Sequence, residues 1–483
     1  MKQLWAIKPT NQDVSSDKRL VLDRTLGPWA LTALGIGAVI GGGIFVVTGQ
    51  AAALHAGPAI MVSFIIAAIC CAFCALAYAE FAGLVPMSGS AYSYTYATFG
   101  ELAAWFIGWM LVLEYGVSAS AVAVSWGGYF ISFLHHLHLD LPIYLTVAPL
   151  DSHLHRTGSL MNLPAAAIVM ILIIPCYIGI RQSTAVNNVM VLIKMILILL
   201  VIFAGIHFIN PANWHPFIPK QAAPGQYGWG GIFRGASMVF FAYIGFEAVS
   251  VAAQESKSPQ RDLPFSMLTS LIICTVLYVA MAAVLTGLIP YAQLQTDEPV
   301  ITAIAAHPEL SWLRFIVEIG ALVGLASVVL VMLISQPRIF MIMALDGLLP
   351  PCMKRLHPTH HTPHINTVIT GVSIAILAAI FPLELISDLT SMGTLISFAT
   401  VCAGVIVLRY KQPQLQRVFR VPAAWFVCSA GFLSCLALLT TMTAINWVLM
   451  AVWTVGGFIF YFLYGFRHSL MRRPLSSATS TQP

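Results

Sequence analysis

Residues 35–45 read GIGAVIGGGIF, and five of the nine residues from 35 to 43 are glycine. This stretch lies within an apolar run, 27–51, that is long enough to cross the hydrocarbon core of a membrane. Each glycine in a helix interior costs about 1 kcal/mol relative to alanine. Close packing against another helix explains Gly37 and Gly41, which are four residues apart, but it does not explain three consecutive glycines. The stretch therefore predicts a local break in a membrane-spanning helix.

A second interruption is predicted in residues 235–247, which read GASMVFFAYIGFE. A glycine, Gly245, and an acid, Glu247, stand there in the middle of another apolar run. Each interrupted run is the first of five in a segment of nearly equal length, 27–208 or 229–409. Paired interruptions at corresponding places in two halves are the best sequence pointer to a transporter binding site. Because five helices per half is an odd number, the two halves have opposite orientations, which predicts an inverted repeat.

The composition indicates a protein that crosses the membrane many times. Hydrophobic residues make up 59% of the 483 residues, charged residues make up 8%, and the mean hydropathy is +0.86. A soluble domain carries about 25% charged residues. The composition also excludes a disordered chain and a secreted disulfide scaffold. We expect an all-α integral membrane protein with twelve transmembrane helices, at 27–51, 57–84, 102–133, 163–181, 186–208, 229–253, 265–290, 312–344, 364–382, 384–409, 423–443 and 446–467.

Lysine and arginine are unevenly distributed between the two sides of the expected bundle. Twelve spans place both termini on the same side, and 18 of the 23 Lys and Arg residues fall on that side, against four on the other. Since Lys and Arg are enriched in cytoplasmic loops, we expect a multi-pass protein of the cell (inner) membrane with both termini in the cytoplasm. An amino-terminal segment, 1–26, and a tail, 468–483, are then cytoplasmic, and helices 11 and 12 occupy 423–467.

The two breaks predict a binding site for a molecule that carries both charges. A half-helix that begins at membrane depth presents free N–H groups and the positive end of its dipole, and one that ends there presents free carbonyls. The carboxylate of an α-amino acid needs such donors, and its ammonium needs such acceptors. The expected donors are the backbone amides of Gly41, Gly42 and Gly43. The expected acceptors are the carbonyls of Phe241, Ala242 and Ile244. The remaining expected substrate-binding residues in these segments are Val39, Ile40 and Tyr243.

Several short motifs resemble one known family. They are the glycine motif at 35–45, Gly57-Pro58, Tyr78-Ala79-Glu80, PMSGSAYSY at 86–94, Gly100-Glu101, Glu114-Tyr115, Asn188, Lys194, FFAYIGFE at 240–247, Glu255, SPQRDLP at 258–264 and DGLLP at 346–350. Together they resemble the amino acid–polyamine–organocation (APC) superfamily and, within it, the bacterial relatives of cationic amino acid transporters. The resemblance covers most of residues 20–410. It implies a LeuT-type five-plus-five inverted repeat with discontinuous helices 1 and 6, plus two extra helices.

Two ionisable residues inside the expected spans are candidates for proton coupling. Lys194 lies eight residues into the fifth span, about 12 Å deep, where a lysine costs about 2.5–3.5 kcal/mol on insertion scales. The resemblance implies that Lys194 lies near the first break, where sodium-coupled members hold an ion. Its ammonium then either replaces that cation and carries the coupled proton, or is a permanently charged strut bonded to backbone carbonyls. Glu114, in the third span, is either a second proton site or the partner of a polar group.

The resemblance also places Met332, in the eighth span, at a pocket-lining position. A bulky thioether there shortens the side-chain pocket, so we expect small neutral L-amino acids such as alanine to be favoured. The expected function is that of a secondary active transporter (permease) that imports amino acids across the plasma membrane by proton symport. The alternatives are a transporter of cationic amino acids (arginine or lysine), an amino acid exchanger, and a membrane amino acid sensor with the same fold.

Other function classes find little support in the sequence. There is no His-Glu-x-x-His motif and no Gly-Lys dipeptide, so neither that zinc site nor a P-loop is expected, and the chain is not expected to be an enzyme. The basic residues are spread over loops, which argues against nucleic-acid binding. The nine cysteines, among them Cys70, Cys71 and Cys74, fall mostly inside apolar runs and are interpreted as small buried hydrophobes. We expect no cofactor, no metal and no obligatory protein partner; the expected partners are the amino acid, protons and the lipid bilayer.

Overall fold

The computed structural model of the chain describes residues 25–85, 89–151 and 155–472. In these ranges the backbone is mostly helical, and its only sheet-like pairings are three isolated bridges. The all-α fold class is therefore confirmed. Most of the expected cytoplasmic segments and the start of the PMSGSAYSY motif lie outside the described residues.

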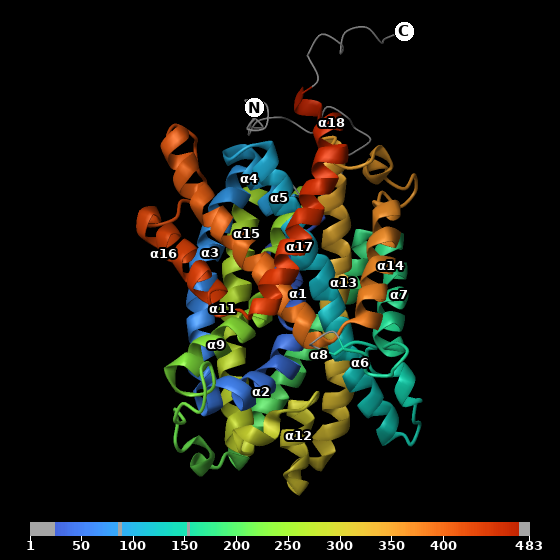
Figure 1. Cartoon of the computed structure of the whole chain (residues 1–483), viewed down its shortest axis with the longest axis vertical. Helices are drawn as coiled ribbons and strands as arrows, with labels where there is room; N and C mark the ends of the chain where they lie inside the picture. Colours follow the sequence, from blue (N-terminus) through green and yellow to red (C-terminus); the bar gives the residue numbers. More distant parts are fainter. Residues whose placement is uncertain (1–24, 86–88, 152–154, 473–483) are drawn as a thin grey trace.

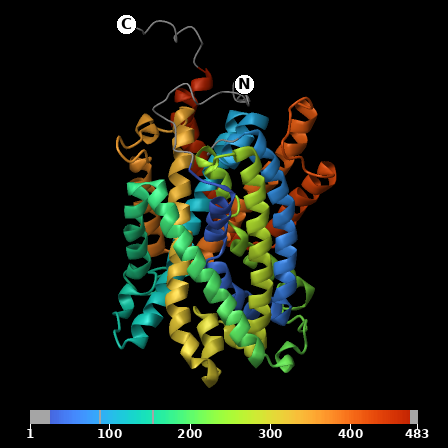
Figure 2. The same ribbon diagram turned by 180° about the vertical axis from the view of Figure 1, so that it is seen from behind.

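The helices form a single bundle whose long members follow one axis, vertical in Figures 1 and 2. The α-helices are α1 (Pro28–Val39), α2 (Thr48–Ala51), α3 (Ile60–Leu84), α4 (Ala91–Thr98), α5 (Glu101–Leu111), α6 (Ser118–His136), α7 (Leu163–Ile178), α8 (Ile180–Gly205), α9 (Gly228–Phe240), α10 (Ala248–Val251), α11 (Pro259–Leu288), α12 (Pro299–Ala305), α13 (Ser311–Leu345), α14 (His364–Ile380), α15 (Leu383–Lys411), α16 (Ala424–Leu439), α17 (Ala444–Phe460) and α18 (Phe466–His468). The shorter π- and 3-10 segments used below are η4 (Gly43–Val47), η7 (Val112–Val117), η11 (Phe241–Tyr243) and η12 (Ala253–Glu255).

Eight helical stretches of the described chain are long and apolar enough to cross a membrane. Four further apolar helices, α1, α7, α14 and α16, are shorter, and each of the twelve expected spans overlaps one of these stretches or helices. Large apolar side chains on the outside of the bundle are exposed, such as Leu192 on α8, Phe426 on α16 and Val452 on α17. Exposed apolar surface of this extent needs a hydrocarbon environment, since water-soluble monomers rarely expose large apolar patches.

The two ends of the bundle carry different short elements, with α4 and α18 at one end and α2 and α12 at the other (Figure 1). The amide of Leu26, just before α1, donates to the carbonyl of Glu255, and the amide of Lys257 donates to the carbonyl of Leu26. Near the other end of the described chain, the amide of Leu470 donates to the carbonyl of Asp346. Both ends of the chain are thus fastened at the α4/α18 end, here called the terminal end.

The first predicted break is present. Helix α1 ends at Val39, the next residue, Ile40, has an extended conformation with ψ 99°, and the chain bends through Ile40 and Gly41. Gly42 already has helical angles, and η4 begins at Gly43. The break therefore lies at Ile40 and Gly41, and Gly42 and Gly43 belong to the helix that follows. Both are helical because the helix restarts immediately after the bend, and Gly43 serves a close contact that is described below.

The second predicted break is also present. Helix α9 ends at Phe240, η11 follows, and Ile244 is extended with ψ 130° before α10 begins at Ala248. Gly245 has φ +123°, a backbone conformation that residues with a Cβ rarely adopt. The glycine in the middle of this span is therefore required by the break itself.

Candidate functional site

The two breaks touch each other at the centre of the bundle. A Cβ added at Gly43 would lie 2.2 Å from the Cβ and 2.3 Å from the Cα of Ala242. A Cβ added at Gly245 would lie 2.8 Å from the carbonyl carbon of Ala38, in the last turn of α1. The interrupted backbones thus cross at van der Waals distance, and only glycine permits this approach.

Lys194 on α8 binds the end of α1. Its Nζ donates three hydrogen bonds, each 2.8 Å long, to the carbonyls of Gly37 and Ile40 and to the hydroxyl of Ser327 on α13. The side chain is fully buried. An ammonium is well suited to this place because the last carbonyls of a helix lack intrahelical donors and carry the negative end of its dipole. The implied position of Lys194 beside the first break agrees with this geometry.

A tyrosine that the sequence did not single out joins the two breaks. The hydroxyl of Tyr278 on α11 lies 2.7 Å from the carbonyl oxygen of Val39 and 2.8 Å from that of Ala242. Tyr278 is fully buried. Its hydroxyl has a single hydrogen for the two acceptors, and one of these acceptors, Ala242, is an expected ligand of the substrate ammonium.

A pair of buried carboxyl groups lies beside the second break. Glu247 accepts a hydrogen bond of 3.1 Å from the amide of Gly245, and its side chain interacts with that of Glu114 in η7. Both side chains are fully buried, and neither oxygen of Glu114 has a hydrogen-bond partner among the described residues. Two like charges this close and this far from water repel each other strongly.

The other predicted substrate-binding residues are buried in or around the breaks. A Cβ at Gly42 would lie 3.0 Å from the hydroxyl of Ser125 on α6 and 3.9 Å from the ring of Phe241. The hydroxyl of Tyr243 is directed away from the first break and donates to the carbonyl of Phe64 on α3. Ile244 forms the extended link of the second break, and its amide donates to the carbonyl of Phe241.

The eighth expected span approaches the first break through a residue other than the one expected. A Cβ added at Gly41 would lie 2.6 Å from a methyl group of Val328 on α13. Met332 is one turn further along the same helix and is fully buried. Val328 and Ser327 are thus the α13 side chains with defined contacts at the break, and the pocket-lining role of Met332 stays a prediction.

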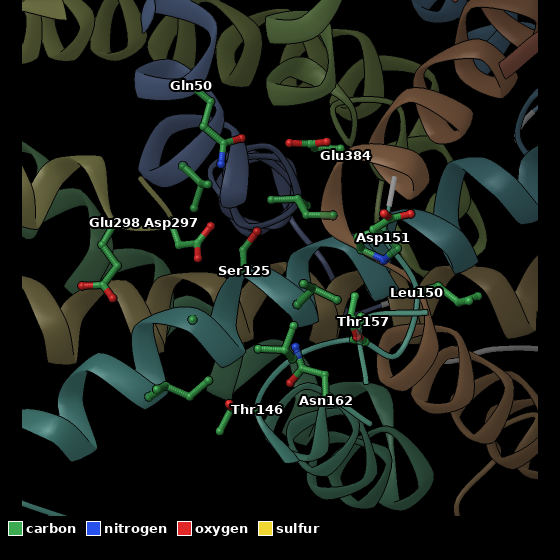
Figure 3. Close-up of a pocket in the computed structure, with 18 of the residues that line it drawn as sticks. Gln50, Ser125, Thr146, Leu150, Asp151, Thr157, Asn162, Asp297, Glu298 and Glu384 are labelled. Atoms are coloured by element: carbon green, nitrogen blue, oxygen red, sulfur yellow. The ribbon is translucent and has the colours of Figure 1, made fainter. Parts of the chain in front are cut away.

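A cavity leads to this site from the α2/α12 end of the bundle. Its volume is about 590 Å³, and Figure 3 shows its polar side chains, among them Gln50, Ser125, Asp297, Glu298 and Glu384. Because Ser125 lies against Gly42, the cavity reaches the first break. Burial, with a smaller contribution from the negative charge of Asp297, raises the pKa of Glu298 to about 6. The approach to the site is acidic.

A buried ion pair lies near the terminal end of the bundle. The guanidinium of Arg338 on α13 donates to Oε1 of Glu255 in η12 through Nε at 3.1 Å and Nη2 at 2.8 Å, and Nη1 donates to the carbonyl of Ile334. Both charged side chains are almost completely buried. This pair ties α13 to the segment that follows the second break, near the terminal end, whereas the cavity lies toward α2 and α12.

Comparison with known proteins gives consistent matches. A family model described as amino acid permease matches residues 26–466. The branched-chain amino acid permease BcaP of Bacillus subtilis (strain 168) is 44% identical over 452 residues, 94% of this chain and 95% of that protein. The methylthioribose transporter of the same organism is 42% identical over 475 residues, 98% of this chain and 100% of that protein. The vacuolar cationic amino acid transporter 4 of Arabidopsis thaliana is 36% identical over 401 residues, 83% of this chain and 66% of that protein. These matches are transporters, not enzymes.

Proposed function

We propose that this chain, which belongs to the amino acid permease family, is a secondary active transporter that imports amino acids across the cell (inner) membrane. In this proposal it crosses the membrane twelve times, as a five-plus-five inverted repeat of the LeuT type with two extra helices. Both termini are cytoplasmic, so the terminal end faces the cytoplasm. The observation that carries the proposal is the contact between two broken helices, at Gly43 and Ala242, in the middle of an apolar bundle.

The exposed peptide groups of the two breaks bind the two charges of the amino acid. The amides of Gly41, Gly42 and Gly43 donate to the substrate carboxylate at the start of the restarted helix, where the dipole is positive. The carbonyls of Phe241, Ala242 and Ile244 accept hydrogen bonds from the substrate ammonium. The carbonyl of Ala242 also accepts from Tyr278, so in this proposal the ammonium and the hydroxyl share this acceptor.

Transport proceeds by alternating access, with the two ends of the bundle opening in turn. The acidic cavity admits the substrate from outside, and the pair of Arg338 and Glu255 keeps the cytoplasmic end closed. Removing one partner of a buried ion pair costs about 3–5 kcal/mol, which is enough to reverse the balance between two conformations of similar free energy. The ion pair therefore acts as the inner latch.

We expect Arg338→Ala to open the cytoplasmic end. A reporter cysteine is introduced beside the second break by Ser250→Cys, and a membrane-impermeant thiol reagent is applied to inside-out vesicles. We expect this cysteine to react at least about tenfold faster when Arg338→Ala is present than when Arg338 is kept, because a population shift of 1.4 kcal/mol is tenfold. Cys352→Ser removes the exposed natural thiol from the background. Arg355→Ala changes an exposed arginine and leaves the rate unchanged. Equal rates in Arg338→Ala and Arg355→Ala contradict the latch.

The cavity attracts ammonium groups through its carboxylates, so Glu298 makes binding depend on pH. A carboxyl with a pKa of about 6 is mostly neutral at pH 5 and mostly charged at pH 7. With the same pH on both sides, we expect the ratio of the apparent KM for arginine, a net cation, to that for alanine, a neutral zwitterion, to fall about three- to fivefold between pH 5 and 7, the effect of one charge roughly 10 Å away in a partly wet cavity. Glu298→Gln removes most of this change, whereas Glu309→Gln, at an exposed acid, preserves it. A pH dependence that survives in Glu298→Gln excludes the role of this carboxyl.

Proton symport is the proposed driving force, with Lys194 and Glu114 as the coupling residues. Lys194 replaces a bound cation at the end of α1, and loss of its proton releases the carbonyls of Gly37 and Ile40. The facing carboxyls of Glu114 and Glu247 share a proton, which removes the repulsion between two like charges. Both groups contact a broken helix, so protonation at either one changes the stability of a break.

Small neutral amino acids such as alanine are the proposed substrates, with Met332 shortening the side-chain pocket. The similar proteins extend the test set, because they include a branched-chain amino acid permease, a methylthioribose transporter and a cationic amino acid transporter. Purified protein in liposomes with an imposed inward pH gradient is therefore tested with labelled alanine, leucine, arginine and methylthioribose.

Alanine that accumulates only with the gradient supports the whole proposal. A strong preference for arginine or methylthioribose overturns the substrate assignment, and a requirement for amino acid inside the liposome identifies an exchanger. Specific binding without any uptake identifies a sensor.

A further inference from the structure

Four thiols from three helices meet away from the breaks. Cys70 and Cys74 lie on α3, Cys402 on α15 and Cys435 on α16. The sulfur of Cys435 lies 3.8 Å from that of Cys70 and 3.6 Å from that of Cys74, and the sulfur of Cys402 lies 3.8 Å from that of Cys74. The sulfurs of Cys70, Cys74 and Cys435 all lie within 4.8 Å of one another. The interpretation of these residues as separate buried hydrophobes does not account for sulfurs that face each other.

The helices bring these sulfurs together by spacing and by close packing. Cys70 and Cys74 are four residues apart and lie on one face of α3. Gly431 precedes Cys435 by about one turn of α16, and a Cβ there would lie 2.8 Å from the sulfur of Cys402. Glycine at this position lets α16 approach α15 and α3 closely enough for Cys435 to reach the pair on α3.

The separations suit a metal ion bound by three sulfurs. A metal about 2.3 Å from each of three sulfurs in one plane holds those sulfurs about 4 Å apart. Two of the separations are 3.8 and 3.6 Å, and the third is within 4.8 Å, so adjustments of some tenths of an ångström complete the triangle. Sulfur-only ligands select soft cations, of which Cu(I) accepts three ligands.

Binding of the metal changes the protonation of the sulfurs. All four thiols are buried, and an uncompensated charge in such a place is costly. Each sulfur that binds the metal loses its proton, so Cu(I) held by three thiolates carries a net charge of −2 and is bound more tightly as the pH rises. The hydroxyl of Ser434 lies 3.3 Å from the sulfur of Cys70 and 3.0 Å from the carbonyl oxygen of Gly431. When its single hydrogen is donated to the sulfur, it stabilises the charged form of that ligand.

A cavity provides access to this cluster. It has a volume of about 390 Å³, and its lining includes Cys70, Ser434 and the apolar side chains of Ile66, Ile69 and Phe233. Ile69 is itself an exposed residue of the outer surface. The cavity therefore connects Cys70 with the apolar outer surface of the bundle.

We propose that Cys70, Cys74 and Cys435 form a three-sulfur site for a soft monovalent metal ion of the Cu(I) class, bridging α3 and α16. The site is separate from the two breaks and does not depend on the transport function proposed above. Its bridging position predicts that the metal stabilises the packing of α16 against α3.

The test uses the full chain carrying Cys352→Ser, purified in detergent without oxygen and given Cu(I) in competition with a Cu(I) chelator. We expect one Cu(I) per chain, with an X-ray absorption spectrum of three sulfur neighbours, and a higher temperature of thermal unfolding. Cys435→Ser weakens binding at least about 100-fold, and Ser434→Ala weakens it about tenfold, the usual size of an outer-shell effect. Cys176→Ser, at a buried thiol on α7 outside the cluster, binds copper like the parent.

Two results overturn the proposal: a parent chain that loses its copper to the chelator, and a Cys435→Ser variant that retains it. Should Cys435→Ser fail to fold, Cys74→Ala takes its place in the copper-binding test. The change in the parent's unfolding temperature on addition of copper is the second measurement. Alanine uptake by the same preparations is recorded separately, so failure of the metal site and failure of transport are distinguished.

Discussion

Uptake falls at least about 100-fold when Gly43 is replaced by valine, while the protein still inserts and folds. The added Cβ would lie 2.2 Å from the Cβ of Ala242, a distance that no rotamer relieves, so the two broken helices must separate. A displacement of about 1 Å at a reacting or binding centre commonly costs 100-fold in rate. The loss is measured as the initial rate of alanine uptake in liposomes per amount of protein. Gel filtration and the unfolding temperature establish that the variant is folded.

Two further variants make this result specific to the contact. Gly456→Ala changes a glycine of α17 with nothing within 4 Å of the added Cβ, and its uptake equals that of the parent. Gly42→Ala introduces a Cβ 3.0 Å from the hydroxyl of Ser125, which a small shift accommodates, so its loss is much smaller. A Gly43→Val variant with parental uptake refutes the contact between the breaks as the basis of the site.

Lys194→Met removes the response of uptake to a pH gradient. The substitution keeps the length of the side chain but leaves the carbonyls of Gly37 and Ile40 and the hydroxyl of Ser327 without a donor. Each buried polar group left unpaired costs about 1–3 kcal/mol, so the unfolding temperature falls as well. We expect accumulation of alanine under an inward pH gradient to drop to the level reached without the gradient.

The readout separates the two roles left open for Lys194. Ser327→Ala removes one of its three acceptors but leaves the titratable group, so some dependence on the gradient persists at reduced stability. If Lys194 is only a charged strut, Lys194→Met and Ser327→Ala differ in stability and rate while both keep their dependence on the gradient. Retention of gradient-driven accumulation in Lys194→Met therefore refutes the proton role.

The existence of the two breaks was predictable, and the exact path of the chain through them was not. Consecutive glycines and a glycine followed by an acid are unfavourable in any helix, so local sequence preferences alone indicate an interruption. Which glycine unwinds depends on packing. Gly43 is helical because Ala242 of the other half lies against it, and that neighbour is about 200 residues away in the sequence.

Among the side chains that contact the two broken helices, only a charged one could be predicted from the sequence. Lys194 stood out because a lysine in hydrocarbon is costly, whereas Tyr278 and Ser327 are ordinary in an apolar run and gave no signal. Val328 is one of many valines, so its contact with Gly41 depends on the rotation of α13, which local periodicity does not fix. The thiol cluster was missed for a similar reason, because Cys435 is more than 360 residues from Cys70 and Cys74.

The hydroxyl of Tyr278 has one hydrogen and faces two acceptors, the carbonyls of Val39 and Ala242. At every instant one of these two carbonyls is therefore left without its donor. Rotation about the C–O bond of Tyr278 therefore switches this hydrogen from one broken helix to the other. In the proposed site, the substrate ammonium supplies a hydrogen to the carbonyl of Ala242, so each carbonyl has a donor when the hydroxyl of Tyr278 donates to Val39.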